Sequence, residues 1–414
     1  MIQSKVYSKI LLYVSVLILL LNIFEITIAL WGVVVLLTYQ SKVSSKFLTL
    51  QILLLATLFI AFCSSFFYDI NAHHFLRDFA YLIKPIFGLL IGYNITKMVG
   101  KETIYTVINI GVLTALIHIL ILFFCYYVFS IKNVNQLREY GGYFNDFEIY
   151  ALVLVLFKDR FNLMLSKQKV VLFSIILLIS SLLYLSRTNM LQFGILFLAL
   201  KGYLRITKRG LKRAVFFLIS TGSLYAYVFY LNPHRNGKGF EAFLYKVKNA
   251  PIEAFKTKIN KNDWKEFNDN FRSYENIITY KQVTQEGPRA TLIGKGLGST
   301  VDYGQKMYTN EGTYIRQAPA LHNGFFTVFL KSGLLGVLLL ILFIYYFSKT
   351  NKYNLNLQYY NYLFVGSTLF LIFSNWVFMG LYLKLDNKSI FYGFLICYYE
   401  LVIKGEAKEN EQYE

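Results

Sequence analysis

The chain has 414 residues, of which 56% are hydrophobic, 18% aromatic and only 16% charged. A water-soluble domain cannot bury that much apolar surface, so lipid must be the solvent for most of the chain, and the sequence predicts an integral membrane protein. In a soluble protein the net charge of +19 would favour nucleic acid as a partner. In a membrane protein the same surplus marks cytoplasmic loops and contact with membrane lipids, so we expect no nucleic-acid partner.

Apolar runs recur along the chain, and a helix needs about twenty apolar residues to cross roughly 30 Å of hydrocarbon. The first run follows Lys5 and Lys9 and has no small-residue cleavage site after it, which indicates a retained signal anchor. Reading the chain in such windows predicts twelve spans, near residues 8–22, 24–39, 48–68, 76–96, 103–128, 148–165, 170–185, 189–204, 214–231, 322–347, 359–381 and 389–403.

These spans divide the chain into three regions. Residues 1–231 hold the first nine spans, and residues 322–414 hold the last three and a cytoplasmic tail. Between them lies a polar segment, residues 232–321. Apolar residues recur in it at three-and-four spacing, which predicts two or three amphipathic helices across the mouth of the bundle; they are Phe240, Phe243, Leu244, Val247, Tyr274, Ile277 and Ile278. The predicted fold class is therefore all-α, a polytopic membrane protein with one large helical loop.

Lysine and arginine in the short loops predict the orientation. One set of loops holds most of them, including Lys42, Lys46, Lys97, Lys101 and the cluster from Lys201 to Arg213, and this side is expected to be cytoplasmic. Both termini then lie inside and the polar segment faces outward. In a Gram-negative bacterium this places the protein in the inner membrane with the polar segment in the periplasm.

Two cations lie at the outer end of the fourth predicted span. Arg77 and Lys84 are seven residues apart, so both should point the same way, about 10 Å apart along the helix axis. Ionisable groups at this depth are costly unless they face a wet cavity or a counter-charge such as Asp78. Lys84 is therefore a candidate site residue, whereas Arg77 could instead extend its head group to the interface.

Further arginines are expected on the outer side, where basic residues are normally scarce. A convergent group of them would fit an anionic ligand, because the planar guanidinium donates two parallel hydrogen bonds to phosphate. Each of them taken alone could equally be a surface residue. The candidates are Arg138, Arg187, Arg272, Arg289 and Arg316.

His322 lies where the polar segment re-enters the membrane. Its imidazole can accept a proton near neutral pH, as deprotonation of a sugar hydroxyl requires, and Asn323 could orient it or bind a sugar. The alternative is a hydrogen-bonded histidine at the interface.

The glycine-rich run Gly294–Ser299 lacks the spacing of a P-loop and is expected to form a turn or an anion-binding nest. Gly333 and Gly336 should let a neighbouring helix approach closely.

The order of these parts resembles the bacterial O-antigen polymerase and O-antigen ligase superfamily, over residues 77–340. The matching pieces are Arg138 with Gly141 or Gly142, Phe144 and Asn145; Ser186-Arg187; Arg272 followed by Gly294, Gly296 and Gly298; and His322-Asn323 before Gly333 and Gly336. The chain departs from the commoner pattern at Asp146, where proline often precedes asparagine. It also departs in the inserted stretch Gly287-Pro288-Arg289, which leaves the role of Arg289 open.

The resemblance implies a GT-C-like glycosyltransferase that acts at the outer face of the inner membrane in lipopolysaccharide and surface polysaccharide biosynthesis. Its donor would be a glycan linked to undecaprenyl pyrophosphate, and a chain-length regulator would be a further partner. His322 would be the catalytic base, acting with Arg272, and Arg77, Lys84, Arg138, Arg187, Arg289 and Asn323 would bind the pyrophosphate or substrate. No cluster of residues has the spacing of metal ligands, so we expect a metal-independent reaction without cofactors, which inverts the anomeric centre.

The acceptor distinguishes a polymerase from a ligase. It is another lipid-linked repeat unit in the first case and a sugar of the lipid A core in the second. The stretch from Asp78 to Gly92 is similar to stretches of polymerases, which favours the polymerase. The third hypothesis is a flippase or other carrier of lipid-linked oligosaccharides. Inverted-repeat carriers have paired broken spans, and here only Pro85 is seen to interrupt a span, which disfavours a carrier.

Overall fold

The structure is a computed structural model, and it describes residues 2–142, 145–204, 208–234, 241, 244–245, 247–249, 256–260, 263–308, 314–350, 357–384 and 386–411. These residues are mostly helical. The helices of the first half, in chain order, are α1 (Ile2–Leu17), α2 (Phe24–Leu37), α3 (Ser45–Ser65), α4 (Ala72–Val99), α5 (Thr103–Tyr127), α6 (Val134–Gly141), α7 (Asp146–Leu156), α8 (Lys167–Leu183), α9 (Arg187–Leu200) and α10 (Lys208–Tyr230).

Polar side chains start several of these helices. The Ser44 hydroxyl accepts the Phe47 N–H at 3.1 Å before α3, and the Asn71 side-chain oxygen accepts the His73 N–H at 2.9 Å before α4. Such caps satisfy backbone donors that have no partner inside the first turn of a helix. The starts of these helices therefore follow from single polar residues placed before apolar runs.

The polar segment contains α12 (Trp264–Asp269), α13 (Phe271–Gln285) and α14 (Pro288–Ile293), followed by strands β1 (Val301–Tyr308) and β2 (Tyr314–Ala318). The strands pair antiparallel, with Val301 opposite Ala318. The helix α13 confirms the amphipathic pattern around Ile277, whereas the hairpin was not predicted. Phe240 and Phe243 of the other predicted helix lie outside the described residues.

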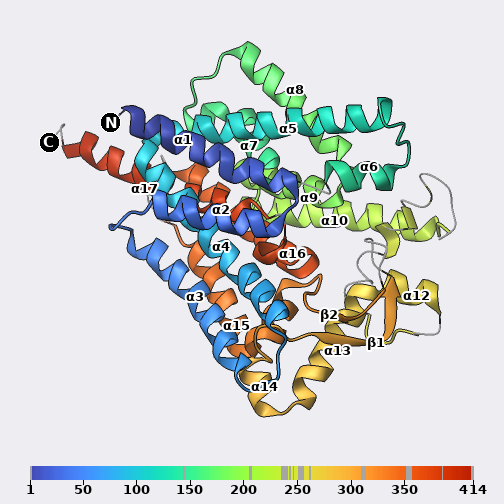
Figure 1. Ribbon diagram of the computed structural model, residues 1–414. Coiled ribbons are helices and arrows are strands. Elements are labelled where there is room, and N and C mark those ends of the chain that lie inside the picture. Colours follow the sequence, from blue (N-terminus) through green and yellow to red (C-terminus); the bar gives the residue numbers. More distant parts are fainter. Residues whose placement is uncertain are drawn as a thin grey trace.

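The chain then enters α15 (Gly324–Ser348), α16 (Gln358–Phe378) and α17 (Lys388–Glu411). The last two are joined by a segment that contains a single 3-10 turn, Gly380–Tyr382. In Figure 1 both termini lie at one end of the bundle, and α12, α13, α14 and the hairpin lie at the opposite end, which we call the polar end.

Five helical stretches in the described residues are long and apolar enough to cross a membrane: Ser4–Leu21, Ser45–Ser65, Ala72–Tyr127, Gly324–Ser348 and Gln358–Phe378. Large apolar side chains are also exposed at helical spacing, such as Leu48, Ile52, Leu55 and Phe59 on α3. In water such a stripe would be unfavourable, whereas lipid accommodates it. A mostly helical, membrane-embedded chain is thus what the sequence led us to expect, and the number of twelve spans stays a prediction.

Two details differ from the predicted spans. The span predicted at residues 148–165 is shorter, because α7 ends at Leu156 and the charged run Lys158–Phe161 forms a 3-10 turn. The second difference is in α15, whose backbone leaves helical geometry at Gly333, where φ is 64°. Pro85 is therefore not the only interruption of a span.

Glycines bring two long helices into backbone contact. A Cβ atom at Gly92 of α4 would lie 1.9 Å from the Ile390 carbonyl oxygen of α17, and one at Gly393 would lie 2.1 Å from the Leu89 carbonyl oxygen. Small residues at matching positions allow this approach in membrane bundles. The close packing fixes the first turns of α17 against the second half of α4.

Candidate functional site

His322 forms a dyad with Glu275, a residue that the sequence analysis did not select. The ring nitrogen Nδ1 lies 2.7 Å from Oε2 of Glu275, and the His322 backbone N–H donates to the same oxygen at 3.2 Å. A carboxylate only accepts hydrogen bonds, so Nδ1 carries a hydrogen, and in the neutral imidazole the free lone pair is then on the other ring nitrogen, Nε2. The Glu275 side chain is 2% exposed and that of His322 is 49% exposed, so the dyad is anchored on one side and open on the other.

Glu275 is itself held by hydrogen bonds. The Tyr303 hydroxyl on β1 donates to its Oε1 at 2.5 Å, and the Tyr274 hydroxyl donates to the Tyr303 carbonyl oxygen at 2.5 Å. Burial, and after it the charge of Glu275, raise the pKa of Tyr303 far above its usual value, so this hydroxyl stays a donor. The hairpin thus serves the site by holding the carboxylate in place.

Arg272 lies in the same neighbourhood. It precedes Glu275 by three residues on α13, which places both on one face of the helix. Its guanidinium lies 5.1 Å from the centre of the Phe378 ring, and the next residue, Met379, donates its N–H to the His322 carbonyl oxygen at 2.8 Å. The structure therefore connects the two predicted catalytic residues, His322 and Arg272, through Phe378 and Met379.

Asn323 does not have the first of its two expected roles, which was to orient the imidazole of His322. Its Oδ1 accepts the N–H groups of Phe325 and Phe326 at 2.9 and 3.2 Å and so caps α15. Glu275, not Asn323, orients the imidazole. The Asn323 Nδ2 atom is buried without a hydrogen-bond partner.

Arg77 lies against an acidic neighbour and does not point the same way as Lys84. Its Nε donates to Oδ1 of Asp78 at 3.2 Å. The other oxygen of Asp78 accepts the Gly298 N–H at 2.7 Å and pairs with Lys331 of α15, which also donates to the Ser299 carbonyl oxygen. Lys331 is 2% and Asp78 is 3% exposed, so this ion pair is closed to solvent.

Lys84 is fully buried, and the expectation that it faces a pyrophosphate does not match its contacts. Its Nζ donates to the carbonyl oxygens of Leu383 and Lys384 at 3.0 and 2.6 Å. It also lies 5.4 Å from the centre of a Trp31 ring. The ammonium group thus contacts backbone between α16 and α17, and Arg77 and Lys84 do not converge on one ligand.

Arg138 lines a cavity of about 330 Å³ between α5, α6 and the end of α8. The other lining residues are mostly apolar, and His118 lies at its wall. Behind this wall the Nδ1 atom of His118 lies 2.8 Å from the Ser180 hydroxyl, which donates to the buried Glu148 at 2.5 Å. Phe144, part of the segment compared with the superfamily, lies outside the described residues.

The remaining predicted arginines are at the surface. Arg187 is exposed at the first turn of α9, and Arg289 lies 4.3 Å from the centre of the Phe67 ring beyond the end of α3. Arg316 pairs with Asp302 across the hairpin, with Nε 2.9 Å from Oδ1. None of these contacts connects the three arginines to His322. Among the described contacts of the predicted arginines, those of Arg272 reach the surroundings of His322.

The run Gly294–Ser299 is neither a free turn nor an open anion nest. The N–H groups of Lys295 and Gly296 donate to the carbonyl oxygens of Leu330 and Lys331, and that of Leu297 donates to Ala61. A Cβ atom at Gly294 would lie 2.5 Å from the backbone of Lys331. The run fills the break in α15 at Gly333, and its backbone donors are used there, so they are not available to a phosphate.

The part of the chain described by the structure contains no group of three or more His, Cys, Asp or Glu side chains that could hold a metal ion. Comparison of the chain with protein-family models, with curated protein sequences and with solved structures gave no match. The geometry around His322 and the pattern of the sequence are therefore the basis for a proposed function.

Proposed function

We propose that the chain is a membrane-embedded glycosyltransferase of the surface-polysaccharide polymerase type. Its donor would be a glycan linked to undecaprenyl pyrophosphate, and its acceptor a hydroxyl of another lipid-linked repeat unit. The observation that carries the proposal is the His322–Glu275 dyad, anchored by buried side chains and half-exposed at the junction of the bundle and the polar segment. A positioned base at this junction suits a substrate whose lipid lies in the membrane and whose sugars lie in water.

The dyad can perform the proton transfer that such a reaction needs. Nε2 of His322 would take the proton of the acceptor hydroxyl while the oxygen forms a bond to the anomeric carbon of the donor. The bond between that carbon and the pyrophosphate oxygen breaks on the opposite face, which inverts the anomeric centre. Glu275 stabilises the imidazolium formed in this step, and the proton then leaves from Nε2 to water.

Arg272 would offset the charge of the leaving pyrophosphate. A diphosphate leaves with its negative charge already spread over several oxygens, so it needs electrostatic stabilisation more than a protonating acid. A guanidinium donates two parallel hydrogen bonds to such a group. The position of Arg272 beside Phe378 and one helical turn from Glu275 supports this role.

The proposed location is the inner membrane of a Gram-negative bacterium, with the polar end in the periplasm. The loops predicted to be cytoplasmic hold most of the lysine and arginine of the short loops. The position of both termini at the end opposite the hairpin supports this orientation (Figure 1). A ligase would use the same dyad with a lipid A core sugar as acceptor.

The test is complementation of a strain that lacks the gene, followed by gel analysis of its lipopolysaccharide. The polymerase proposal expects one repeat unit on the core in the deletion strain, long chains with the wild-type protein and one repeat unit again with His322→Ala at equal protein abundance. His73→Ala, an exposed histidine of α4, is the matched control and should restore long chains. Bare core with accumulated lipid-linked polymer would identify a ligase, and normal ladders with His322→Ala would refute the site.

A further inference from the structure

The segment between α16 and α17 contacts both candidate catalytic residues. The Phe378 ring lies under the guanidinium of Arg272, and the Met379 N–H donates to the carbonyl oxygen of His322 at 2.8 Å. Met379 has a φ of 61°, a left-handed conformation that costs a non-glycine residue about 1–2 kcal/mol. Such a conformation persists only where its surroundings hold it. Residues 378 and 379 therefore connect the site to whatever fixes this segment.

Two buried lysines hold the carbonyl groups of the segment. Nζ of Lys388 donates to the Gly380 carbonyl oxygen at 3.1 Å. Nζ of Lys84, from α4, donates to the Leu383 and Lys384 carbonyl oxygens at 3.0 and 2.6 Å. Irregular backbone inside an apolar bundle has no water to satisfy its carbonyl groups, so donors must come from side chains. The two ammonium groups supply them along the segment from Gly380 to Lys384.

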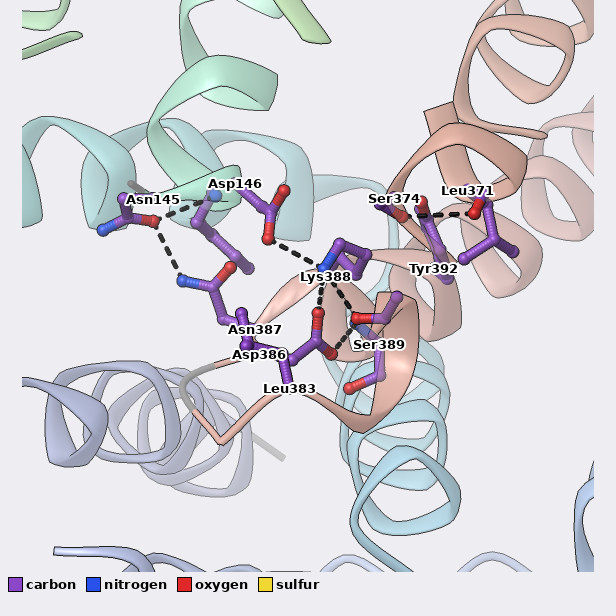
Figure 2. A network of polar contacts seen from close by, with 12 residues as sticks. Asn145, Asp146, Leu371, Ser374, Leu383, Asp386, Asn387, Lys388, Ser389 and Tyr392 are labelled. Carbon is purple, nitrogen blue, oxygen red and sulfur yellow. Dashed lines mark hydrogen bonds and ion pairs between the residues drawn. The ribbon is translucent and has the colours of Figure 1, made fainter. Parts of the chain in front are cut away.

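Lys388 is in turn held by carboxylates on both sides. Figure 2 shows Lys388 between Asp146 of α7 and Asp386, and its Nζ lies 3.1 Å from Oδ2 of Asp146. Next to it, Nδ2 of Asn387 donates to Oδ1 of Asn145 at 2.9 Å. The segment is thus tied to α4, α7 and the start of α17.

We propose that Lys84 and Lys388 are positioning residues, which act on His322 and Arg272 through the segment Phe378–Lys384 and do not touch the substrate. This inference rests on the proposed function for its kinetic consequences, but the positioning itself does not. Lys84 then has a role different from pyrophosphate binding. Its charge is used to satisfy a backbone that carries the contacts of the site.

A purely structural role is the alternative, because removal of one partner from any buried ion pair destabilises a protein. The two readings differ at His322. If the lysines only stabilise the bundle, variants that still fold keep His322 in its native environment. If the lysines position the segment, these variants alter the surroundings of His322 while the rest of the bundle stays intact.

The first experiment measures the geometry of His322 without any substrate. Purified full-length protein is treated with diethyl pyrocarbonate, and acylation of His322 is followed by mass spectrometry. The variants are Lys84→Met, Lys388→Met and the charge-matched pair Asp386→Asn with Lys388→Met. We expect each to raise the acylation rate of His322 several-fold, because the backbone hydrogen bond from Met379 and the pairing with Glu275 are loosened.

Tyr93→Phe is the matched control. Tyr93 is a buried residue of the same helix as Lys84, and its hydroxyl donates to Glu400 of α17 at 2.8 Å, near the terminal end of the bundle. This variant removes a buried contact between α4 and α17 without touching the segment. Its His322 acylation rate should equal that of the wild type.

The second experiment measures transfer with a purified lipid-linked oligosaccharide. The turnover number of Lys388→Met should fall about 100-fold, as expected for a misplacement on the order of 1 Å, while the KM for the donor stays within about twofold. Lys388→Arg keeps the charge and the donors and should recover most of the turnover.

The outcomes separate the two proposals. An unchanged acylation rate of His322 in folded Lys84→Met and Lys388→Met protein overturns the positioning role, whatever the activity. A larger KM with unchanged turnover overturns it too, since it would place these lysines at the substrate. No transfer by the wild-type protein, together with raised acylation in the variants, contradicts the proposed function and supports the positioning role.

Discussion

Two buried carboxylates near the polar end differ in one respect, the exposure of the side chain that donates a hydrogen bond to each. The carboxylates of Glu275 and Asp78 are both almost fully buried, at 2% and 3% exposed. The Lys331 partner of Asp78 is 2% exposed, whereas the His322 partner of Glu275 is 49% exposed. Lys331, the partner of Asp78, is closed to solvent, and His322, the partner of Glu275, is open to it.

The difference indicates which of the two pairs a substrate could reach. Asp78 accepts hydrogen bonds from Lys331, Arg77 and the Gly298 N–H. Lys331 also donates to the Ser299 carbonyl oxygen. They hold the glycine-rich run against α15. In the other pair Glu275 accepts hydrogen bonds from Nδ1 and from the backbone N–H of His322, and the imidazole side chain is 49% exposed. We therefore read the closed pair as scaffold and the open pair as the site.

The largest effect is expected from Glu275→Gln. The amide keeps the shape but cannot stabilise an imidazolium or fix the tautomer, so turnover should fall by about 10²–10⁴-fold. The measurement is the initial rate of transfer by purified protein. Because the change is isosteric, the thermal midpoint should change little. A rate within about twofold of the wild type would contradict the role of the dyad.

Lys331→Met should act on stability. It leaves the carboxylate of Asp78 buried without its main partner, which typically costs about 3–5 kcal/mol. The double variant Asp78→Asn with Lys331→Met removes both charges and should recover much of this loss. Thermal unfolding in detergent measures the difference. Equal stability of the single and double variants would show that the closed pair is not the scaffold proposed here.

Gly296→Ala tests the glycine-rich run that the closed pair holds. Gly296 has a φ of 81°, and a Cβ atom there would lie 2.4 Å from the Ser65 backbone nitrogen. The strain should lower the free energy of unfolding by roughly 1–3 kcal/mol. Gly194→Ala is the control, since it lies within α9 with nothing within 4 Å of its Cβ position. The reverse ranking of the two variants in thermal unfolding would contradict this account.

The smallest effect is expected at the exposed Arg316–Asp302 pair of the hairpin. The Arg316 hydrogen bond, and after it the Gly304 N–H, lower the pKa of Asp302 below its ordinary value of 3.8. A lowered folded-state pKa stabilises the fold above the unfolded pKa, and the contribution disappears as the pH falls through the folded one. Arg316→Gln should therefore lower the thermal midpoint slightly at pH 7 and not at all in strong acid. A difference that grows in acid would contradict this sign.

The helices of the bundle could largely be predicted from sequence, because apolar runs and single caps determine them locally. Every predicted span overlaps a helix of the structure, and Ser44 and Asn71 mark two of the starts. The hairpin was missed because strands β1 and β2 carry mixed polar residues and neither is a continuous apolar run. Gly333 was expected to allow the close approach of a neighbouring helix, but it is the backbone around Leu292 and Gly294 that lies against it.

The candidate site was predicted only in part. His322 and Arg272 stood out as single residues, but Glu275 lies 47 positions from His322, and only the fold brings them together. One signal was available, since Glu275 follows Arg272 by one helical turn. Lys331 could also have been found, because a lysine within an apolar span needs a partner. The cations at Arg138, Arg187 and Arg289 could not be assigned to a common place without tertiary contacts.

The short helix α9 has a consequence for the lipid around it, because Met190 and Leu191 on its surface are exposed. Its 14 residues correspond to about 21 Å at 1.5 Å per residue, well below the roughly 30 Å of a bilayer interior. If α9 spans the membrane, as the sequence predicts, the hydrocarbon chains next to it must compress or tilt, so the head-group layer dips toward the bundle. In the proposed reaction, a lipid-anchored sugar chain approaching along this depression would lose little of its hydration on the way.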